Sequence, residues 1–149
     1  MDDLVEFLRA RLDHDEQVAR EATVGPWRNA PTARRHLTAS GRSEEAVFAA
    51  PPDTGALIVA TTGEASERRN LVNAEHIARH DPARVLAEVE AKRRIVRALE
   101  SAEVALRNTE PGKEPYELMT GSVNSLRAVV QMLASVYADH PDYRAEWRP

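Results

Sequence analysis

The spacing of hydrophobic positions predicts a mainly helical chain that also contains a short stretch of sheet. Within residues 2–22, Leu4, Leu8 and Leu12 recur at steps of four, which places them on one face of a helix. Pro26 follows this segment, and proline cannot continue a helix because it lacks an amide hydrogen. We therefore expect the first helix to stop where the segment ends.

Two β-branched and apolar segments follow, at residues 46–49 and 56–62. The turn-forming sequence of residues 51–55 separates them, which predicts an antiparallel hairpin. A third short strand is predicted over residues 36–39. Two or three strands are not stable alone, so one face of this sheet should pack on helices.

The second half of the chain predicts three helices. A short helix should begin near Asn70 and stop at Pro82, where the next helix opens and continues to about Asn108. Residues 110–115 form the clearest loop. The last helix carries an apolar seam at alternating steps of four and three, formed by Met119, Val123, Leu126, Val130, Leu133 and Tyr137. We expect the last two helices to pair, and the broad apolar face of the last one to form a homodimer.

These elements predict an α+β fold that is mainly helical. An N-terminal helix would be followed by a small antiparallel sheet of two or three strands, a short helix and a long antiparallel helical hairpin. The chain of 149 residues has the size of a single domain. Residues 1–81 would hold the first helix and the sheet, residues 82–139 the hairpin, and residues 140–149 a tail that docks back.

Composition narrows the classes of function. The 20 basic and 24 acidic residues are mixed along the chain and give a net charge of -4, which disfavours general nucleic-acid binding. The absence of cysteine removes disulfides and thiolate metal sites. No apolar run reaches the ~18 residues that span a membrane, and the acidic N-terminus is unlike a secretory signal. We expect a cytoplasmic protein with no cofactor and no membrane contact.

Several segments of the sequence resemble phage and actinobacterial proteins. The segments TVGPW at 23–27, NAEHIA at 73–78 and PARVL at 82–86 are similar to the recurring pattern of the Ead-like accessory proteins of phages and prophages. Residues 1–20, 76–86 and 137–149 resemble a family of actinobacterial and actinophage proteins of unknown function. These resemblances imply a phage or mobile-element setting, with the protein in the host cytoplasm, and they supply no activity.

A group of basic residues is the first candidate for a binding site. Arg68 and Arg69 directly precede the helix expected from Asn70. The amide groups and dipole of a helix N-terminus attract anions, so arginines beside it would form a phosphate site. The candidate ligand-binding residues are Arg68, Arg69, Asn70, Asn73, Arg28, Trp27 and Arg35. The alternative is that these arginines are exposed loop residues that balance acidic neighbours.

His76 and His80 are the candidate metal ligands. They lie four residues apart on a predicted helix, so both imidazoles share one face, as a zinc site requires. Arg79 lies between them and would repel a cation, and no glutamate inside the pair could serve as a general base. The alternative is that both histidines cap or pack near the corner at Asp81.

The sequence shows no Gly-rich phosphate loop, nucleophile elbow or Ser/His/Asp arrangement, and it offers no catalytic residue. We therefore expect a non-enzymatic phage or mobile-element accessory protein that binds a phosphorylated small molecule or a host protein. Sequestering a nucleotide-type signal would act against host defence. Two alternatives stay open: a metal-dependent hydrolase using His76 and His80, and a structural module that assembles through its last helix.

Overall fold

The computed structural model describes residues 1–29, 36–37, 43–49 and 57–149. The elements in chain order are α1 (Asp2–Glu21), β1 (Trp27–Asn29), β2 (His36–Leu37), β3 (Ser43–Ala49), β4 (Leu57–Glu64), α2 (Arg68–Arg79), α3 (Pro82–Arg107), α4 (Glu114–Ser135) and the short 3₁₀ helix η1 (Ala145–Trp147). The fold is α+β and mainly helical, which confirms the predicted class.

Contacts divide the chain into two compact units, which we name the helical unit and the sheet unit. The helical unit comprises Met1–Asp15 with Glu88–Pro149, and the sheet unit comprises Glu16–Ala87. The expectation of a single domain with boundaries after residues 81 and 139 stays a prediction. Each unit is described below by itself.

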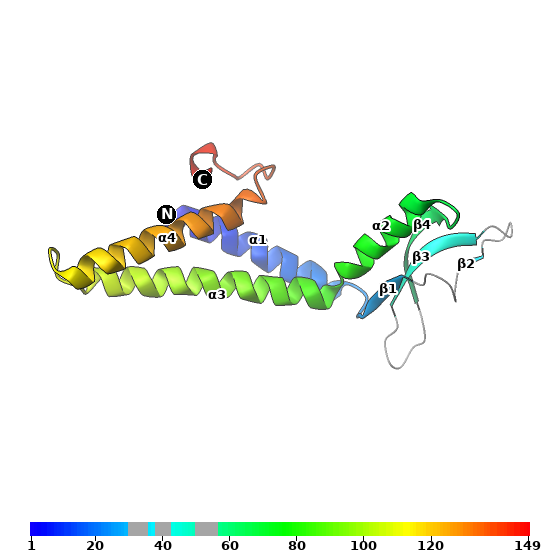
Figure 1. The fold of residues 1–149 in the computed structure, drawn as a ribbon, viewed down its shortest axis with the longest axis horizontal. Helices are drawn as coiled ribbons and strands as arrows, with labels where there is room; N and C mark the ends of the chain where they lie inside the picture. The colour runs from blue at the N-terminus through cyan, green and yellow to red at the C-terminus, as the bar shows by residue number, and fades with distance from the viewer. Residues whose placement is uncertain (30–35, 38–42, 50–56) are drawn as a thin grey trace. The chain divides into compact units, whose positions relative to one another are not determined.

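The helical unit is built around a buried apolar core. α3 and α4 run in opposite directions, as expected for the hairpin (Figure 1). Arg127 of α4 donates from Nε and Nη2 to Oε1 of Glu103 on α3, at 3.0 and 2.8 Å. The buried apolar residues include Leu4, Leu8 and Leu12 of α1, Val89, Val96 and Leu99 of α3, and Val123, Val130 and Ala134 of α4. Three amphipathic helices therefore contribute to this core.

The C-terminal tail docks on α1 through aromatic side chains. The ring of Trp147 lies 5.2 Å from that of Phe7, and the ring of Tyr143 lies 5.8 Å from it. Arg144 donates to Oδ2 of Asp3 at 2.7 Å, and its guanidinium lies over the Trp147 ring. Only 9% of Trp147 is exposed, so burial of this ring helps to hold the tail on α1.

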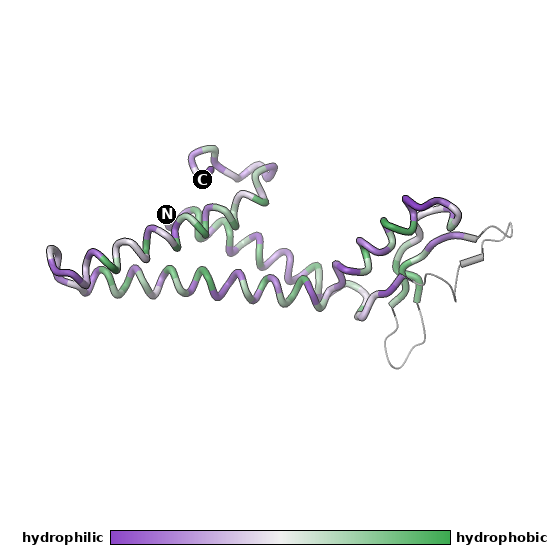
Figure 2. The backbone as a smooth tube through the Cα atoms, viewed as in Figure 1, coloured by the Kyte–Doolittle hydropathy of each residue, from purple (hydrophilic) through white to green (hydrophobic). Residues whose placement is uncertain are grey.

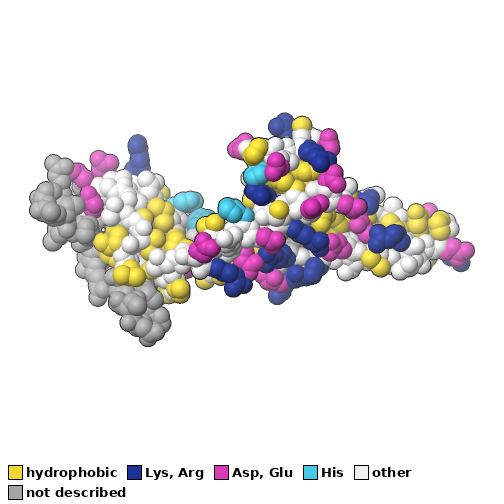
Figure 3. Space-filling view, turned by 180° about the vertical axis from the view of Figure 1, so that it is seen from behind, with side chains coloured by type: hydrophobic (Ala, Val, Ile, Leu, Met, Phe, Trp, Pro, Cys, Tyr) yellow, Lys and Arg dark blue, Asp and Glu magenta, His cyan; other side chains and the backbone are white. Residues whose placement is uncertain are grey.

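Charged side chains of both signs interleave on the surface of the helical unit (Figure 3). Arg93 pairs with Asp13, and Arg9 pairs with Glu100. Hydrogen bonds from two further α3 arginines, Arg94 and Arg97, lower the pKa of the exposed Glu90. None of the helices in the described part of the chain combines the length and the apolar character needed to cross a bilayer.

The sheet unit contains a four-stranded antiparallel sheet centred on β3. β4 pairs along one edge of β3, while β1 and β2 pair with different parts of the other edge. The β3–β4 pair confirms the predicted hairpin, and β2 confirms the third strand; the predicted turn at residues 51–55 lies outside the described residues. β1 was not predicted, because three residues are too few to show alternation.

α2 packs on this sheet and contacts β1, β3 and β4. Ala74 of α2 and Val47 and Ala49 of β3 are fully buried. Hydrophobic and hydrophilic positions alternate along the helix (Figure 2), which is typical of a helix with one buried face. α2 begins at Arg68, so the expected start near Asn70 is wrong by two residues. Its first turn is polar and therefore carries no hydrophobic periodicity.

Candidate functional site

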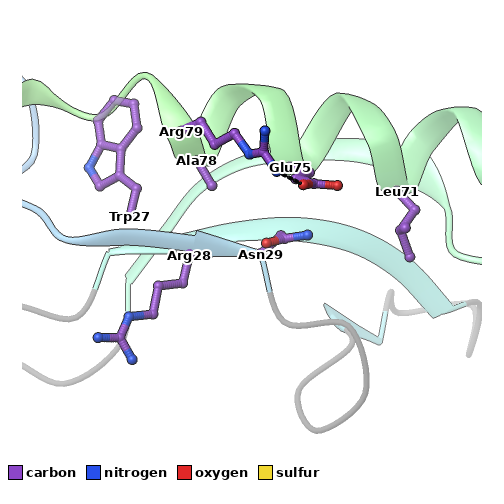
Figure 4. A pocket seen from close by; sticks show the side chains of 7 residues that line it. All are labelled: Trp27, Arg28, Asn29, Leu71, Glu75, Ala78 and Arg79. Carbon is purple, nitrogen blue, oxygen red and sulfur yellow. Dashed lines mark hydrogen bonds and ion pairs between the residues drawn. The ribbon is translucent and has the colours of Figure 1, made fainter. Parts of the chain in front are cut away.

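A groove lies between β1 and α2 in the sheet unit. Its volume is about 560 Å³, within the ~300–1,000 Å³ range of small-molecule pockets. The lining residues are Trp27, Arg28 and Asn29 from β1 and Leu71, Glu75, Ala78 and Arg79 from α2. Because side chains alternate along a strand, Trp27 and Asn29 point toward α2, while the Arg28 guanidinium points away from it (Figure 4). The groove thus combines the aromatic ring of Trp27, the carboxamide of Asn29 and the guanidinium of Arg79.

Trp27 is held in place by its local chain. Its indole Nε1 donates to the backbone carbonyl of Thr23 at 2.8 Å, which satisfies the polar atom of the ring. The turn that delivers Trp27 contains Gly25, where an added Cβ would lie 2.9 Å from a carboxylate oxygen of Asp81. A side chain at residue 25 would therefore displace the Asp81 carboxylate, which glycine leaves in place.

Arg79 and Glu75 form an ion pair on the α2 wall of the groove, one helical turn apart (Figure 4). Both side chains are well exposed, at 68% and 43%. An exposed pair of this kind contributes about 0.2–0.5 kcal/mol. The guanidinium of Arg79 can therefore exchange its partner at little cost.

The predicted arginine site is divided by the structure. Arg68 and Arg69 are the first two residues of α2 and are exposed, whereas Trp27 and Arg28 line the groove near Ala78 and Arg79. Ten residues of helix separate Arg69 from Arg79, which is about 15 Å at 1.5 Å per residue. Arg35 lies outside the described residues.

The N-terminus of α2 has polar partners of its own. Asn70 donates from Nδ2 to the backbone carbonyl of Glu64 at 3.0 Å, so its carboxamide stabilises the turn between β4 and α2. The N-cap residue is Glu67, whose side chain makes no capping bond. Asn73 is exposed. Acidic residues at 64 and 67 would repel a phosphate, so this helix end is a poorer anion site than the sequence suggested.

The two candidate metal ligands do share one helix face. The rings of His76 and His80 lie 4.4 Å apart, and Nδ1 of His80 lies 2.8 Å from the backbone oxygen of His76. Their acidic neighbours are engaged elsewhere: Glu75 pairs with Arg79, and Asp81 accepts the backbone amide of Arg84 at 2.9 Å. Over the described residues, no group of three histidine, aspartate or glutamate side chains could hold a metal ion.

Glu45 of β3 is the buried charged side chain of the described residues, with 1% of its surface exposed. Neither of its carboxylate oxygens has a hydrogen-bond partner, while its backbone carbonyl accepts a long 3.5 Å bond from the Thr62 hydroxyl. Burying a carboxylate in this way is unfavourable. Glu45 is not among the residues that line the groove, so we assign it no part in the site.

The sequence singled out Trp27 and Arg28 of the groove residues and missed the others. Leu71, Glu75 and Ala78 recur at steps of four and three, a signal that they share one face of α2. The residues missed are Asn29, Leu71, Glu75, Ala78 and Arg79. What the sequence could not supply was the strand β1 that faces them.

The model of a family of unknown function, DUF6221, matches residues 1–149. No curated protein and no solved structure matches the chain. The chemistry of the groove is therefore the basis on which a function can be assigned.

Proposed function

The chain belongs to the DUF6221 family of unknown function over its whole length, and from the groove between β1 and α2 we propose that it is a non-enzymatic binding protein for a phosphorylated small molecule of nucleotide type. The sequence resemblances support a phage or mobile-element origin. In the cytoplasm of a host, such binding would sequester a nucleotide signal and so act against host defence.

The observation that carries this proposal is the position of Trp27. Its ring lines the groove while its Nε1 is bonded to the carbonyl of Thr23, so the ring is fixed and its apolar surface is free for contact. Base–aromatic stacking contributes about 1–3 kcal/mol and tolerates every base, because each base has a π face. The carboxamide of Asn29, on the same side of β1, can both donate to and accept from the edge of a base.

Arg79 supplies the charge for a phosphate. Its present partner is the carboxylate of Glu75, and this exposed ion pair is weak. Arginine binds phosphate through two parallel N–H donors, and such charge-assisted bonds are about twice as strong as neutral ones. A phosphate group therefore competes well with Glu75 for the guanidinium.

The lining chemistry favours binding over catalysis. The groove carries no hydroxyl, imidazole, thiol or amine side chain among the described residues that line it. Its one carboxylate, Glu75, is already paired with Arg79. General acid–base and nucleophilic catalysis need such groups next to the reacting atoms.

Fluorescence of Trp27 tests the proposal. The chain has two tryptophans, so Trp147→Phe leaves Trp27 as the sole reporter. Titration with a panel of nucleoside mono-, di- and triphosphates should quench this signal in a saturable way, and Arg79→Ala should weaken the binding at least tenfold. Arg69→Ala is the matched control, because it removes an exposed arginine from the other end of the same helix.

Three results would contradict the proposal. The first is a panel in which no phosphorylated compound changes the Trp27 signal, above all if a host protein co-purifies instead. The second is binding lost in Arg69→Ala and kept in Arg79→Ala, which would move the anion site to the N-terminus of α2. The third is a stoichiometric metal at His76 and His80, found by elemental analysis, which would favour the hydrolase alternative.

We propose in addition that the protein is a homodimer through α4. The support is the outer face of α4, where Leu118, Met132 and Val136 are 68%, 57% and 69% exposed. Large apolar side chains exposed on one helix face are a feature of surfaces that bind other proteins. Light scattering should give twice the 16.6 kDa mass of the chain, and a monomer at working concentration would contradict this part of the proposal.

A further inference from the structure

α4 carries a row of exposed, uncharged side chains beside its buried apolar face. Its members recur at steps of four, three, four, three and four, and they are Leu118, Ser122, Ser125, Val129, Met132 and Val136. All six are exposed. Val136 is the C-cap residue and keeps helical dihedral angles, with φ -65° and ψ -15°, so the pattern runs through the end of the helix. We name these six residues the outer seam.

The outer seam belongs to a face without charge. From residue 118 to residue 138 the single charged side chain is Arg127, and both of its hydrogen bonds go to Glu103 of α3. Exposed helix faces normally carry many charged residues, because these keep the surface solvated. A neutral face gives no electrostatic preference for an acidic or a basic partner, and it does not repel an identical copy.

The positions of the outer seam are spaced symmetrically about residue 127. Ser125 and Val129 lie two residues to either side of it, Ser122 and Met132 five residues, and the two end positions nine residues. Each inner pair combines a small side chain with a larger one. Two helices that run in opposite directions about this centre would therefore place every large inner side chain against a small one.

The two serines of the outer seam can pack against apolar side chains, because their hydroxyls already have hydrogen-bond partners. The hydroxyl of Ser122 donates to the carbonyl of Leu118 at 3.0 Å, and that of Ser125 donates to the carbonyl of Gly121 at 3.0 Å. Neither serine therefore needs water to satisfy its donor. At Gly121 nothing lies within 4 Å of the position of an added Cβ, which leaves open space beside these serines.

Resting on the homodimer proposed above, we infer that two copies pair antiparallel through the outer seam, centred on residue 127. Val129 of each copy packs on Ser125 of the other, and Met132 packs on Ser122. The steps of four and three are those of a coiled coil, and antiparallel pairing about this centre aligns them along a helix about 33 Å long. Parallel pairing would instead stack serine on serine and methionine on methionine, leaving voids in one half of the interface.

Cysteine cross-linking distinguishes these arrangements, because the chain has no native cysteine. Ser125→Cys protein and Val129→Cys protein, carrying tags of different mass, are oxidised separately and then as a mixture. A disulfide requires Cα atoms within about 7 Å. We expect a covalent heterodimer in the mixture and little product from either protein alone. A mixture of Asn124→Cys with Val129→Cys is the matched control, since Asn124 is exposed on α4 but lies off the seam.

Efficient cross-linking of either single variant alone would overturn the antiparallel arrangement. So would a dimer by light scattering that Met132→Glu leaves intact, because it would place the interface elsewhere while keeping the homodimer. We expect Met132→Glu to give a folded monomer and Val104→Glu, at an exposed apolar position of α3, to leave the dimer unchanged. A monomeric wild-type protein would overturn both this inference and the proposed homodimer. Nucleotide quenching of Trp27 does not depend on any of these results.

Discussion

The side chain of Asn70 fills the space that a Cβ atom at Gly63 would need. An added Cβ would lie 2.6 Å from Nδ2 of Asn70, and Gly63 has a φ of +115°, which side chains disfavour. Asn70 uses the same Nδ2 to donate to the backbone carbonyl of Glu64, and the backbone carbonyl of Asn70 accepts a hydrogen bond from the Thr62 hydroxyl at 2.7 Å. This contact joins β4 to α2 and so places α2 on the sheet.

Gly63→Ala is therefore expected to lower the free energy of unfolding by about 2–5 kcal/mol. About 1–2 kcal/mol comes from the positive φ, and the rest comes from the overlap with Asn70, since overpacking costs about 1–3 kcal/mol. Chemical denaturation followed by circular dichroism measures the loss. Gly112→Ala is the control: its φ is +83° with nothing within 4 Å of the added Cβ, so only the backbone part should appear. Equal losses at the two glycines would contradict the role given to Asn70.

Because of Tyr137, the free energy of unfolding should depend on pH in the alkaline range. Its hydroxyl donates to Oδ2 of Asp15 at 2.6 Å, and burial together with this bond raises the pKa of Tyr137 above its ordinary value of about 10. Above pH 10 the unfolded chain therefore releases a proton that the folded chain keeps. The stabilisation is complete below pH 10 and is lost as the pH rises further.

Tyr137→Phe should lower the free energy of unfolding by about 1–2 kcal/mol at pH 7, the loss of one hydrogen bond to a carboxylate. The difference between wild type and variant should shrink between pH 10 and 11. Urea titrations of both proteins across this range cancel the ionisation of the other tyrosines. A difference that stays constant or grows with pH would contradict the assignment of the proton to Tyr137.

Trp147→Ala should destabilise the helical unit by about 3 kcal/mol, because it empties a buried site next to Phe7. Trp147→Phe keeps a ring there and should lose less than half as much. Thermal unfolding of the two variants makes the comparison. A loss below about 1 kcal/mol for Trp147→Ala, as is usual for surface changes, would show that the tail does not contribute to the core.

Glu75→Gln should strengthen nucleotide binding about twofold. The substitution keeps the shape of the side chain but removes the negative charge that pairs with Arg79, and twofold corresponds to about 0.4 kcal/mol, within the range for an exposed pair one helical turn apart. Quenching of Trp27 measures the affinity. Glu67→Gln, at the N-cap of the same helix, should have no effect. Weaker binding in Glu75→Gln would contradict the exchange of partners at Arg79.

The sequence predicted the long helices well, because their hydrophobic positions repeat over many turns. α1, α3 and α4 end within a few residues of the expected places, and Pro26 and Pro82 mark two of the boundaries. β1 and the first turn of α2 were missed because neither carries a repeating apolar pattern. The missed first turn of α2 changed the predicted anion site. Placing Arg68 and Arg69 inside the helix, rather than in a loop before it, separated them from Trp27.

The groove itself could not be predicted from local patterns. It depends on β1 pairing with β3, with Trp27 opposite Ala49, and on α2 packing across the same sheet. Both are contacts between segments far apart in sequence. In the sequence, Glu75 and Arg79 form an ordinary ion pair on a helix surface. Only the strand facing them makes that pair one wall of a site.

Isothermal titration calorimetry of the wild-type chain with nucleotides tests the proposed binding function most directly. We expect at least one phosphorylated compound to bind with one site per chain, and the matching unphosphorylated nucleoside to bind at least tenfold more weakly, because it lacks the group that Arg79 recognises. Equal binding of the two, or no heat from any phosphorylated compound up to about 1 mM, a limit that corresponds to about 4 kcal/mol of binding free energy, would contradict a phosphate-binding groove at Trp27.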